Sequence, residues 1–394
     1  MFNITELLES QGHQVIPFSI NHNRNKASDY SSYFLDSIGD GEEVYFHQYK
    51  KNKIKDIFHL VGRLFYSFEA KEKLTQLIKD TNPDLLYILL YQNKISPSII
   101  HAAKKQGIPI ALRISDYGMI CGANVFYLSK NQEICELCLV KGQKHLVTNK
   151  CVNNSFIYSS FKFMAFKLHD ILKIKEKIDA FIIPSSFTKS KFMRFGIPGN
   201  KIFHIPSFTK AVPENTVDYH GFVLYFGRIE PEKGIKTLVD AFISSDIPLK
   251  IIGFSSSGYD EIIKKYLSDK KHAISFLGKM EPNEISIYLK TCSFTICSSE
   301  CYDNFPNTIL ESYAFKKAVI ATDIGSLKEM VVHGETGLLF EYKNSSDLKN
   351  KVELLIHDKE RTKLLGQNGY RKLTQEYSEN KHISKLISVF DSLI

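Results

Sequence analysis

Short apolar runs alternate along the chain with longer segments in which apolar residues recur every three or four positions. In the second half, the apolar runs are residues 222–226, 249–252, 274–277, 294–297, 318–321 and 338–340. The segments with helical spacing are residues 235–243, 281–291, 307–315, 345–357 and 359–377. Buried strands that alternate with amphipathic helices are typical of parallel sheets covered on both faces, so the pattern predicts an α/β fold.

The first half of the chain shows the same alternation. Apolar runs at residues 14–20, 84–90, 108–114, 178–184 and 201–206 predict strands, and residues 96–105 and 187–194 predict helices. A polar stretch that contains Pro213, residues 210–221, separates the two halves. We therefore predict two doubly wound domains, residues 1–209 and 218–377, with a ligand-binding cleft between them.

The composition narrows the class of protein. With 394 residues, 43% of them hydrophobic and 24% charged, the chain can bury two cores and is not a disordered protein. The net charge of +8 suits nucleic acid, lipid headgroups or anionic substrates, but Trp and nucleic-acid-binding motifs are absent, so no nucleic-acid partner is expected. No apolar run approaches the roughly 18 residues of a membrane span, and the first basic residue is Arg24, so we expect a cytoplasmic protein.

One group of candidate binding residues follows the apolar run at residues 294–297. Asp303 and Glu311 stand eight positions apart, before and inside a helix that is predicted to begin near Asn307. Free backbone N–H groups at Asn307 and Thr308 would favour a phosphate, and the two carboxylates would accept from hydroxyl groups. The alternative is that the acids only cap the helix.

A second group follows the run at residues 222–226, where Gly227 and Arg228 lead through Lys233 and Gly234 into a helical segment. Open α/β sheets bind ligands at the carboxyl ends of their strands, and Arg and Lys both suit phosphate oxygens. The alternative is an ordinary pair of solvated surface residues.

Taken in order, these segments resemble a known enzyme family. Gly227-Arg228 with Glu232-Lys233-Gly234, the stretch from Asp303 to Glu311, and residues 319–329 and 334–340 resemble the retaining, nucleotide-sugar-dependent glycosyltransferases of the GT-B fold, family four (glycosyl transferases group 1). The resemblance covers residues 175–375 well and the N-terminal part more loosely. One departure concerns the paired acids, which in the family are both Glu, whereas the first is Asp303 here; this puts the sugar preference in question.

The resemblance implies two Rossmann-like domains, with acceptor bound by the first, nucleotide sugar by the second, and a last helix (residues 380–394) that packs back on the first. It implies transfer of a hexosyl group to an acceptor hydroxyl with retention of configuration, in the synthesis of capsule, lipopolysaccharide or a related surface polysaccharide or glycolipid. Arg228 and Lys233 would neutralise the departing diphosphate, Asp303 would hold the sugar and Glu311 the ribose, without a catalytic metal. Further substrate contacts would come from Gly227, Asn304, Phe305, Asn307 and Thr308. A nucleotide-sugar epimerase and a non-catalytic subunit of a polysaccharide-assembly complex stay open as alternatives.

Asp116 follows the apolar run at residues 108–114 and is a candidate acceptor contact. The resembled family usually has His-Asp at this place, and here Ser115 replaces the His. An Asp that caps its own loop is the equally good alternative.

Four of the seven cysteines, Cys121, Cys135, Cys138 and Cys151, fall within 31 residues, and two of them form a C-x2-C pair. This clustering favours a structural four-thiolate zinc site with no catalytic role, and four reduced thiols in a loop are the alternative.

Two basic segments with interspersed aromatic residues, 50–73 and 161–177, are candidates for contact with an anionic membrane. Core-facing helices with a solvated lysine face are the alternative.

The chain begins with an apparent helix start, Asn3-Ile-Thr-Glu6, in which Asn3 would be the N-cap. The predicted helix carries Ile4, Leu7 and Leu8 as its apolar residues. A doubly wound nucleotide-sugar domain normally begins with a strand and a Gly-rich turn. We therefore expect the first N-terminal strand to be missing, through a displaced start codon or truncation.

Overall fold

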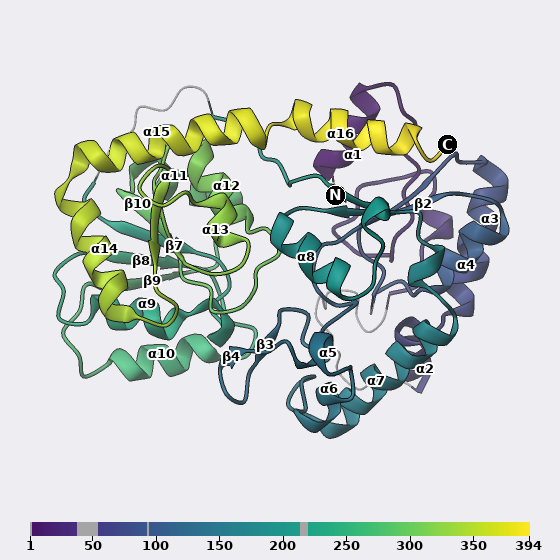
Figure 1. Ribbon diagram of the computed structural model, residues 1–394, viewed down its shortest axis with the longest axis horizontal. Coiled ribbons are helices and arrows are strands. Elements are labelled where there is room, and N and C mark those ends of the chain that lie inside the picture. Colours follow the sequence, from purple (N-terminus) through teal and green to yellow (C-terminus); the bar gives the residue numbers. More distant parts are fainter. Residues whose placement is uncertain (1, 38–53, 93, 213–219) are drawn as a thin grey trace.

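The computed structural model describes residues 2–37, 54–92, 94–212 and 220–394, which form two α/β domains side by side (Figure 1). In the described residues, the N-terminal domain has a four-stranded parallel sheet and the C-terminal domain a six-stranded parallel sheet. The described residues of the N-terminal half also contain one two-stranded antiparallel ribbon. The predicted α/β fold with parallel sheets is therefore confirmed.

The N-terminal sheet has the order β1-β2-β5-β6, with β1 (Leu86–Ile88), β2 (Ile110–Arg113), β5 (Ala180–Ile183) and β6 (Ile202–His204). Its strands are apolar on both faces because each face is covered. Ile110 and Phe181 pack in the core formed with α3 (Phe68–Thr81), α4 (Ser98–Lys105) and α8 (Ser186–Arg194). Ala111 and Ala180 face the other way, toward α1 (Phe2–Ser10) and α16 (Glu379–Asp391).

The C-terminal sheet has the order β12-β11-β10-β7-β8-β9. Its strands are β7 (Val223–Phe226), β8 (Leu249–Ile252), β9 (Ile274–Gly278), β10 (Phe294–Cys297), β11 (Val319–Thr322) and β12 (Gly337–Phe340). The chain starts at β7, builds outward to β9, and then returns to the other side of β7 with β10. The strand order therefore reverses between β7 and β10, which is the place where open α/β sheets bind ligands.

Helices cover both faces of this sheet. Apolar side chains of α9 (Ile235–Phe242), α10 (Tyr259–Leu267) and α14 (Ser345–His357) pack with Val223 and Tyr225 on one face. The other face carries α11 (Pro282–Thr291), α12 (Asn307–Ala314) and α15 (Lys359–Glu376). The short helix α13 (Leu327–Met330) follows β11 at the edge facing the N-terminal domain (Figure 1).

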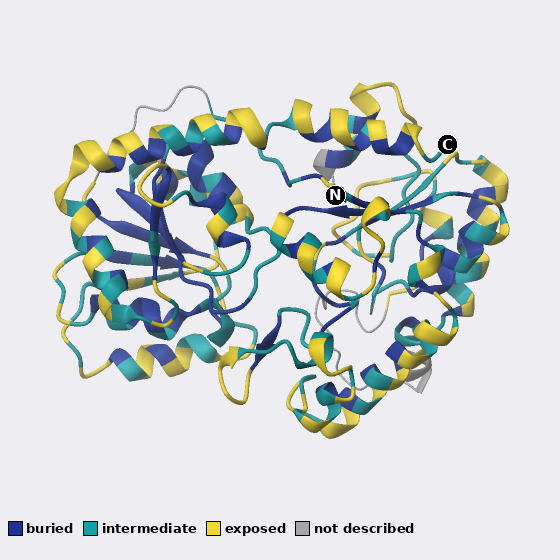
Figure 2. Cartoon of the chain, in the orientation of Figure 1, coloured by how far each residue is buried: buried dark blue, intermediate teal, exposed yellow. Residues whose placement is uncertain are grey.

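The last helix, α16, crosses back from the C-terminal domain and packs on the N-terminal sheet (Figure 1). Figure 2 shows that the side of α16 turned toward this sheet is buried and the other side exposed. Its buried residues are His382, Ile383, Leu386, Val389 and Phe390. The ring of Phe390 meets Tyr87 of β1 edge to face at 5.1 Å, and Pro206 O lies 2.7 Å from His382 Nδ1.

A long segment between β2 and β5 holds the ribbon of β3 (Tyr127–Leu128) and β4 (Glu133–Ile134) and the helices α5 (Leu137–Val140), α6 (His145–Thr148) and α7 (Phe156–Ile171). The ribbon lies between the two domains at the lower edge in Figure 1. Lys343 of the C-terminal domain donates a hydrogen bond to Gln132 O at the tip of this ribbon.

Two predictions about the N-terminal region are wrong. Residues 14–20 form no strand, apart from a single bridge between Ile20 and Leu35, because their apolar side chains lie half-buried against the core instead of within a sheet. The first helix, predicted to follow a cap at Asn3, begins at Phe2. Of the basic segment 50–73, residues 50–53 lie outside the described residues, and the rest contains α2 (Ile54–Leu64) and the start of α3, which Ser67 caps.

Within the described ranges, no helix combines the length and the apolar character that a membrane crossing needs.

Candidate active site

Two loops meet at the point where the strand order of the C-terminal sheet reverses. Gly234 ends the turn after β7 with φ +66°, and a Cβ there would lie 1.9 Å from Ser298 O, so only glycine permits this approach. Ser298 Oγ donates to Lys233 O at 2.9 Å, and Glu300 N donates to Glu232 O at 2.9 Å. These contacts join the loop after β7 to the loop after β10.

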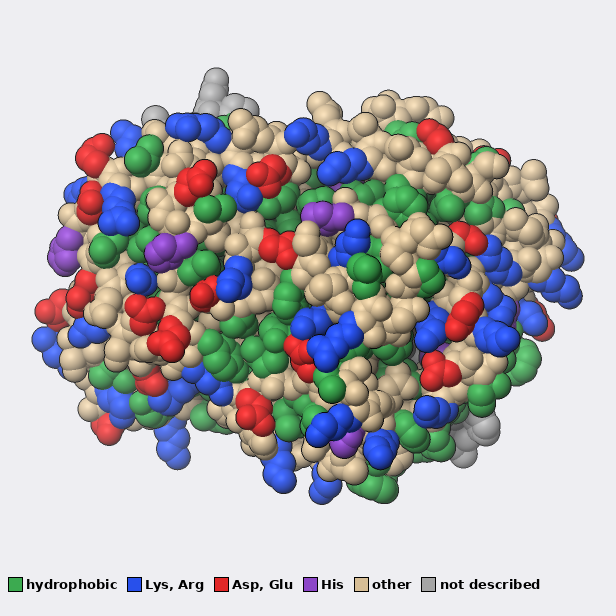
Figure 3. Space-filling view, in the orientation of Figure 1, with side chains coloured by type: hydrophobic (Ala, Val, Ile, Leu, Met, Phe, Trp, Pro, Cys, Tyr) green, Lys and Arg blue, Asp and Glu red, His purple; other side chains and the backbone are tan. Residues whose placement is uncertain are grey.

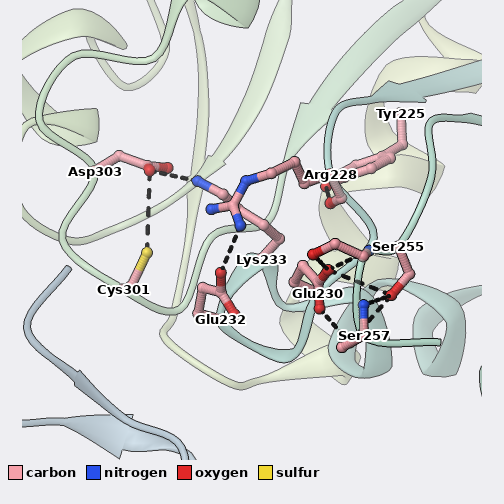
Figure 4. Close-up of polar contacts among 10 residues, drawn as sticks. Tyr225, Arg228, Glu230, Glu232, Lys233, Ser255, Ser257, Cys301 and Asp303 are labelled. Atoms are coloured by element: carbon pink, nitrogen blue, oxygen red, sulfur yellow. Dashed lines mark hydrogen bonds and ion pairs between the residues drawn. The ribbon is translucent and has the colours of Figure 1, made fainter. Parts of the chain in front are cut away.

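The two loops bring Lys233 and Asp303 together. Lys233 Nζ lies 2.5 Å from Asp303 Oδ1, and the side chains are only 17% and 13% exposed (Figure 4). Burial raises the pKa of Asp303, but Lys233 lowers it further, so the carboxyl group stays ionised. Burial likewise lowers the pKa of Lys233, and Asp303 reverses that effect, so the amine stays protonated. The second oxygen, Asp303 Oδ2, is buried and has no hydrogen-bond partner among the described residues.

Arg228 lies beside this ion pair. Its Nη1 is 3.1 Å from Glu232 Oε1, while its side chain remains 40% exposed. The Tyr225 hydroxyl donates to Arg228 O at 2.7 Å and fixes the backbone at the end of β7. Figure 4 shows the guanidinium of Arg228 next to the ammonium of Lys233, so two cationic groups converge where the strand order reverses.

Gly227 stands directly before Arg228 at a close approach between two strand ends. A Cβ on Gly253, which follows β8, would lie 1.8 Å from Gly227 O. Gly227 itself has φ +152° and donates its N–H to Ile252 O at 3.0 Å. The backbone at Gly253, after β8, therefore packs directly on the backbone at Gly227, where the loop of Arg228 begins.

Asn304, the residue after Asp303, makes contacts across the domain boundary. Its Nδ2 donates to Ile114 O at 2.7 Å, at the end of β2. The Thr188 hydroxyl donates to Asn304 Oδ1 at 2.8 Å, and the Ser185 hydroxyl is 3.3 Å from Asn304 O. Both Ser185 and Thr188 lie at the start of α8, so one residue of the C-terminal domain is bonded to two elements of the N-terminal domain.

A second contact across the boundary involves Glu329 of α13. Its carboxylate accepts from the backbone N–H groups of Ser186 and Phe187 at 2.8 and 2.5 Å. These N–H groups are the unpaired donors at the start of α8, so Glu329 supplies the acceptors that the helix itself cannot.

The helix α12 begins at Asn307 after Pro306, and no side chain caps its first turn. The N–H groups of Asn307 and Thr308 stand at this helix start, and their predicted contact with a phosphate stays a prediction. Glu311 lies one turn further along, and burial raises its pKa to about 7. Glu311 is partly buried, and among the described residues no ion pair neutralises its carboxylate, which is unusual for a purely structural carboxylate.

Phe305 lies beside the crossing helix. Its ring meets Tyr377 edge to face at 5.4 Å, and it lines a cavity of about 610 Å³ together with His204, Pro206 and Glu329. Its role as a substrate contact stays a prediction.

Asp116 lies at the carboxyl end of β2, on the N-terminal side of the domain boundary. Gly118 N donates to its Oδ1 at 2.7 Å, so the carboxylate caps its own loop, as the alternative interpretation holds. Burial raises the pKa of Asp116, while Lys162 of α7 lowers it. Lys162 is only 6% exposed, and burial lowers its pKa to about 8 against the opposing effect of Asp116.

Two buried charged residues near the candidate site, Lys162 and Glu230, are not predicted from the sequence. In the sequence, Lys162 is one of many lysines in a basic segment, and the composition of that segment does not indicate which lysine side chain is buried. Glu230 is 5% exposed and accepts from Ser256 N and the Ser257 hydroxyl at 2.7 and 2.5 Å (Figure 4). It thereby fixes the loop after β8 beside the loop of Arg228. The run Ser255-Ser-Ser257 was the available signal.

The four clustered cysteines carry free thiols in the segment between β2 and α7. Burial, together with the nearby Cys121, Cys151 and Cys135, raises the pKa of Cys138 to about 12, so the thiols lie within electrostatic reach of one another. Among the described residues, no group of three or more His, Cys, Asp or Glu side chains is arranged to hold a metal ion. The zinc site stays a prediction.

Comparison with known proteins identifies the class. Residues 210–372 match the family model described as glycosyl transferases group 1. The chain is 33% identical over 184 residues to an uncharacterized glycosyltransferase of Methanocaldococcus jannaschii, covering 47% of this chain and 51% of that protein. It is 25% identical over 276 residues to the capsular polysaccharide biosynthesis glycosyltransferase CapM of Staphylococcus aureus, covering 65% and 67%. The chain thus spans about half the length of the first relative and about two thirds of the second.

Solved structures show the same fold over the whole chain. Sucrose-phosphate synthase of Thermosynechococcus elongatus superposes with a TM-score of 0.67 at 16% identity, covering 99% of this chain and 91% of that one. Anabaena HepE in complex with UDP-glucose gives a TM-score of 0.60 at 18% identity, covering 82% of each chain.

The fold is therefore GT-B, two Rossmann-like domains of the kind that these glycosyltransferases share. The resemblance predicted from the motifs is confirmed for residues 210–372, which match the model of the group 1 glycosyl transferases.

Proposed function

We propose that this protein is a retaining glycosyltransferase that moves a hexosyl group from a nucleoside-diphosphate sugar to an acceptor hydroxyl. The observation that carries the proposal is the convergence of Arg228, Lys233 and Asp303 where the strand order reverses. The match of residues 210–372 to the group 1 family model supports it, as does the likeness of the fold to a protein that was solved with UDP-glucose.

Donor binding would use both loops. The diphosphate would lie between Arg228, Lys233 and the free N–H groups of Asn307 and Thr308, which offer charge and directed donors. The unpartnered Asp303 Oδ2 would accept from a sugar hydroxyl, since a buried acceptor without a partner costs free energy until a ligand supplies a donor. Glu311 would accept from the ribose hydroxyls.

In the chemical step, the bond between the anomeric carbon and the phosphate oxygen breaks and its electron pair remains on the diphosphate. The acceptor oxygen forms the new bond on the same face, and its proton passes to a donor phosphate oxygen. Arg228 and Lys233 would stabilise the charge that builds on the diphosphate, in a site from which domain closure removes water. With two cations in place, we propose that no catalytic metal is needed.

The acceptor would bind on the N-terminal side, where Asp116 faces the boundary between the domains. We take residues 1–209, with the crossing helix, as the acceptor domain and residues 218–377 as the donor domain. CapM acts in capsular polysaccharide biosynthesis, which supports a saccharide or lipid-linked saccharide acceptor here. A cytoplasmic location at the inner face of the membrane would fit such an acceptor.

We also propose a structural zinc ion in the segment of Cys121, Cys135, Cys138 and Cys151. The clustering of the four cysteines in the sequence, with a C-x2-C pair, supports it, although the described side chains are not arranged around a metal ion. Protein purified without added metal should contain about one zinc per chain by elemental analysis. Less than a tenth of an equivalent, with four titratable thiols, would show four ordinary reduced cysteines.

The decisive test follows the release of nucleoside diphosphate from a panel of nucleotide sugars. The proposal requires that release depends on an added saccharide acceptor, and that the product keeps the anomeric configuration of the donor by NMR. An epimerase would act on the donor without any acceptor, and a non-catalytic subunit would bind donor without turnover. A thermal-shift screen would first identify the donor, because a ligand that binds only the folded protein raises its melting temperature.

A further inference from the structure

The helix α7 carries a row of apolar side chains that stay largely exposed in the part of the chain that the structure describes. Ile157, Phe161, Met164 and Ile171 lie at spacings of four, three and seven residues, so they share one face of the helix. Their exposed fractions are 63%, 39%, 47% and 75%. The neighbouring Phe156 and Tyr158, together with Val140 of α5, are also exposed large hydrophobic residues.

This face is not the side by which α7 packs on its own domain. The buried residues of α7 are Ser159, Lys162, Ala165 and Phe166, on the opposite side of the helix. The domain core therefore leaves Ile157, Met164 and Ile171 largely in water, while the ring of Phe161, at the edge of the same face, meets Phe65 at 6.2 Å. A contiguous row of exposed apolar side chains of this kind marks an interaction surface more often than single exposed residues do.

The segment that contains the apolar stripe is rich in exposed lysine. Within residues 137–177, five lysines are exposed, and the exposed acids are Asp170 and Glu176. The exposed lysines of this segment are Lys141, Lys144, Lys150, Lys167 and Lys173. Figure 3 shows lysine and hydrophobic side chains side by side over the region of α5, α6 and α7 at the lower edge of the molecule.

The charge decides what covers this face. A second copy of the chain, docked face to face, would bring the two sets of lysines together, and like charges across an interface oppose association. A membrane that contains anionic lipids offers negative headgroups to the lysines and acyl chains to the apolar residues. We propose that the outer face of α7, with the lysines around it, is the surface by which the protein binds an anionic lipid membrane.

The position of α7 relates this surface to the proposed acceptor site. Lys162, on the inner face of the same helix, interacts electrostatically with Asp116 at the end of β2. If the outer face of α7 lies on the membrane, Asp116 lies on the other side of this helix, away from the lipid. This relation adds a partner to the proposed function, but the membrane surface itself does not depend on the activity.

The test is flotation with vesicles of phosphatidylglycerol and phosphatidylcholine against vesicles of phosphatidylcholine alone. Wild-type protein should float with the anionic vesicles at low salt and remain behind at about 1 M salt, where the screening length is roughly 3 Å. The variant Ile157→Ser/Met164→Ser/Ile171→Ser should bind the anionic vesicles at least about 10-fold more weakly, because it loses the apolar contact.

A matched control carries the same number of exposed apolar-to-serine changes in the C-terminal domain, at Ile262, Ile287 and Leu364, which are 61%, 61% and 52% exposed. This control should bind vesicles like the wild type. The melting temperatures of both triple variants are measured first, so that loss of folding is not mistaken for loss of binding. Transfer to a soluble acceptor should be unchanged in the α7 variant, which separates this proposal from the proposed activity.

Three results would overturn the proposal. The first is that wild-type protein does not bind anionic vesicles at any salt concentration. The second is that the α7 triple variant and the control triple variant bind equally well. The third is a dimer of the wild type, seen by sedimentation, that the α7 substitutions dissociate, since a second copy would then be the occupant of this face.

Discussion

Replacing Lys233 by Ala tests the proposed site most directly, because Lys233 forms an ion pair with Asp303 in the free protein and is also proposed to contact the donor diphosphate. The variant leaves Asp303 ionised, largely buried and without its cation. Breaking a buried ion pair on one side costs about 3–5 kcal/mol, and the remaining exposure of both side chains places this pair near the lower end. At roughly 2–4 °C for each kcal/mol in a domain of this size, the melting temperature should fall by about 6–12 °C.

The loss of stability should depend on pH in a stated direction. In the wild type the pKa of Asp303 is held below its usual value, so the pair contributes stability above the unfolded pKa and loses it as pH falls. The variant lacks this contribution. The difference in free energy of unfolding between wild type and variant should therefore shrink as pH falls below about 4, where the unfolded carboxyl group takes up a proton.

Turnover should fall separately from stability. Removing one charge that stabilises a developing anion lowers kcat by about 10²–10³-fold, with a smaller change in KM. Adding Asp303→Asn to Lys233→Ala should restore much of the stability, since no buried charge is left unpaired, but not the turnover. Lys236→Ala, which removes a more exposed lysine from its pair with Asp240 on α9, is the control and should keep both properties.

The assay is nucleoside-diphosphate release with the identified donor and acceptor, combined with thermal unfolding of each variant. The reasoning fails if Lys233→Ala keeps normal turnover. It also fails if the double variant recovers turnover, because Lys233 would then serve only to neutralise Asp303.

Further outcomes are expected. Burial raises the pKa of Glu311 to about 7, so donor affinity measured by calorimetry should increase as pH rises through this value and the carboxylate ionises; Glu311→Gln should bind donor more weakly and lose this dependence, and a normal affinity would contradict its role. Gly234→Ala should lower the melting temperature markedly, because a Cβ would lie 1.9 Å from Ser298 O, and an unchanged melting temperature would show that the two loops can separate at little cost. Asn304→Ala should lower kcat with little effect on unfolding of the C-terminal domain, since its side-chain bonds reach Ile114 and Thr188 across the domain boundary; small-angle scattering should show a more open molecule. Activity should survive brief treatment with EDTA, whereas its abolition would point to a metal-dependent transferase.

Much of the C-terminal domain could be predicted from the sequence because its strands are apolar on both faces. A run such as residues 294–297 has no polar position that would suit a surface helix, and the turns after β7 and β10 carry the charged residues. Residues 14–20 were misassigned for the same reason, since half-buried apolar side chains on an irregular segment give a similar pattern. Periodicity reports burial, and burial does not require a strand.

The contacts that join the two halves could not be predicted in this way. Asn304 is bonded to residues that are 116 and 190 positions away, and Glu230 to a loop 26 positions further on. No local spacing encodes such pairs. The motif that contains Asp303 indicates a sugar site, but its neighbour Asn304 acquires a function only when the second domain is in place.

The crossing helix has a mechanical consequence. The chain passes from the N-terminal to the C-terminal domain after Pro206 and returns before α16, and His382 Nδ1 lies 2.7 Å from Pro206 O. The two chain segments that connect the domains therefore lie next to each other. A pair of neighbouring attachments permits rotation about the line that joins them and resists twisting and sliding in other directions. The cleft should accordingly open and shut along one arc, so that Asn304 returns to the same partners each time.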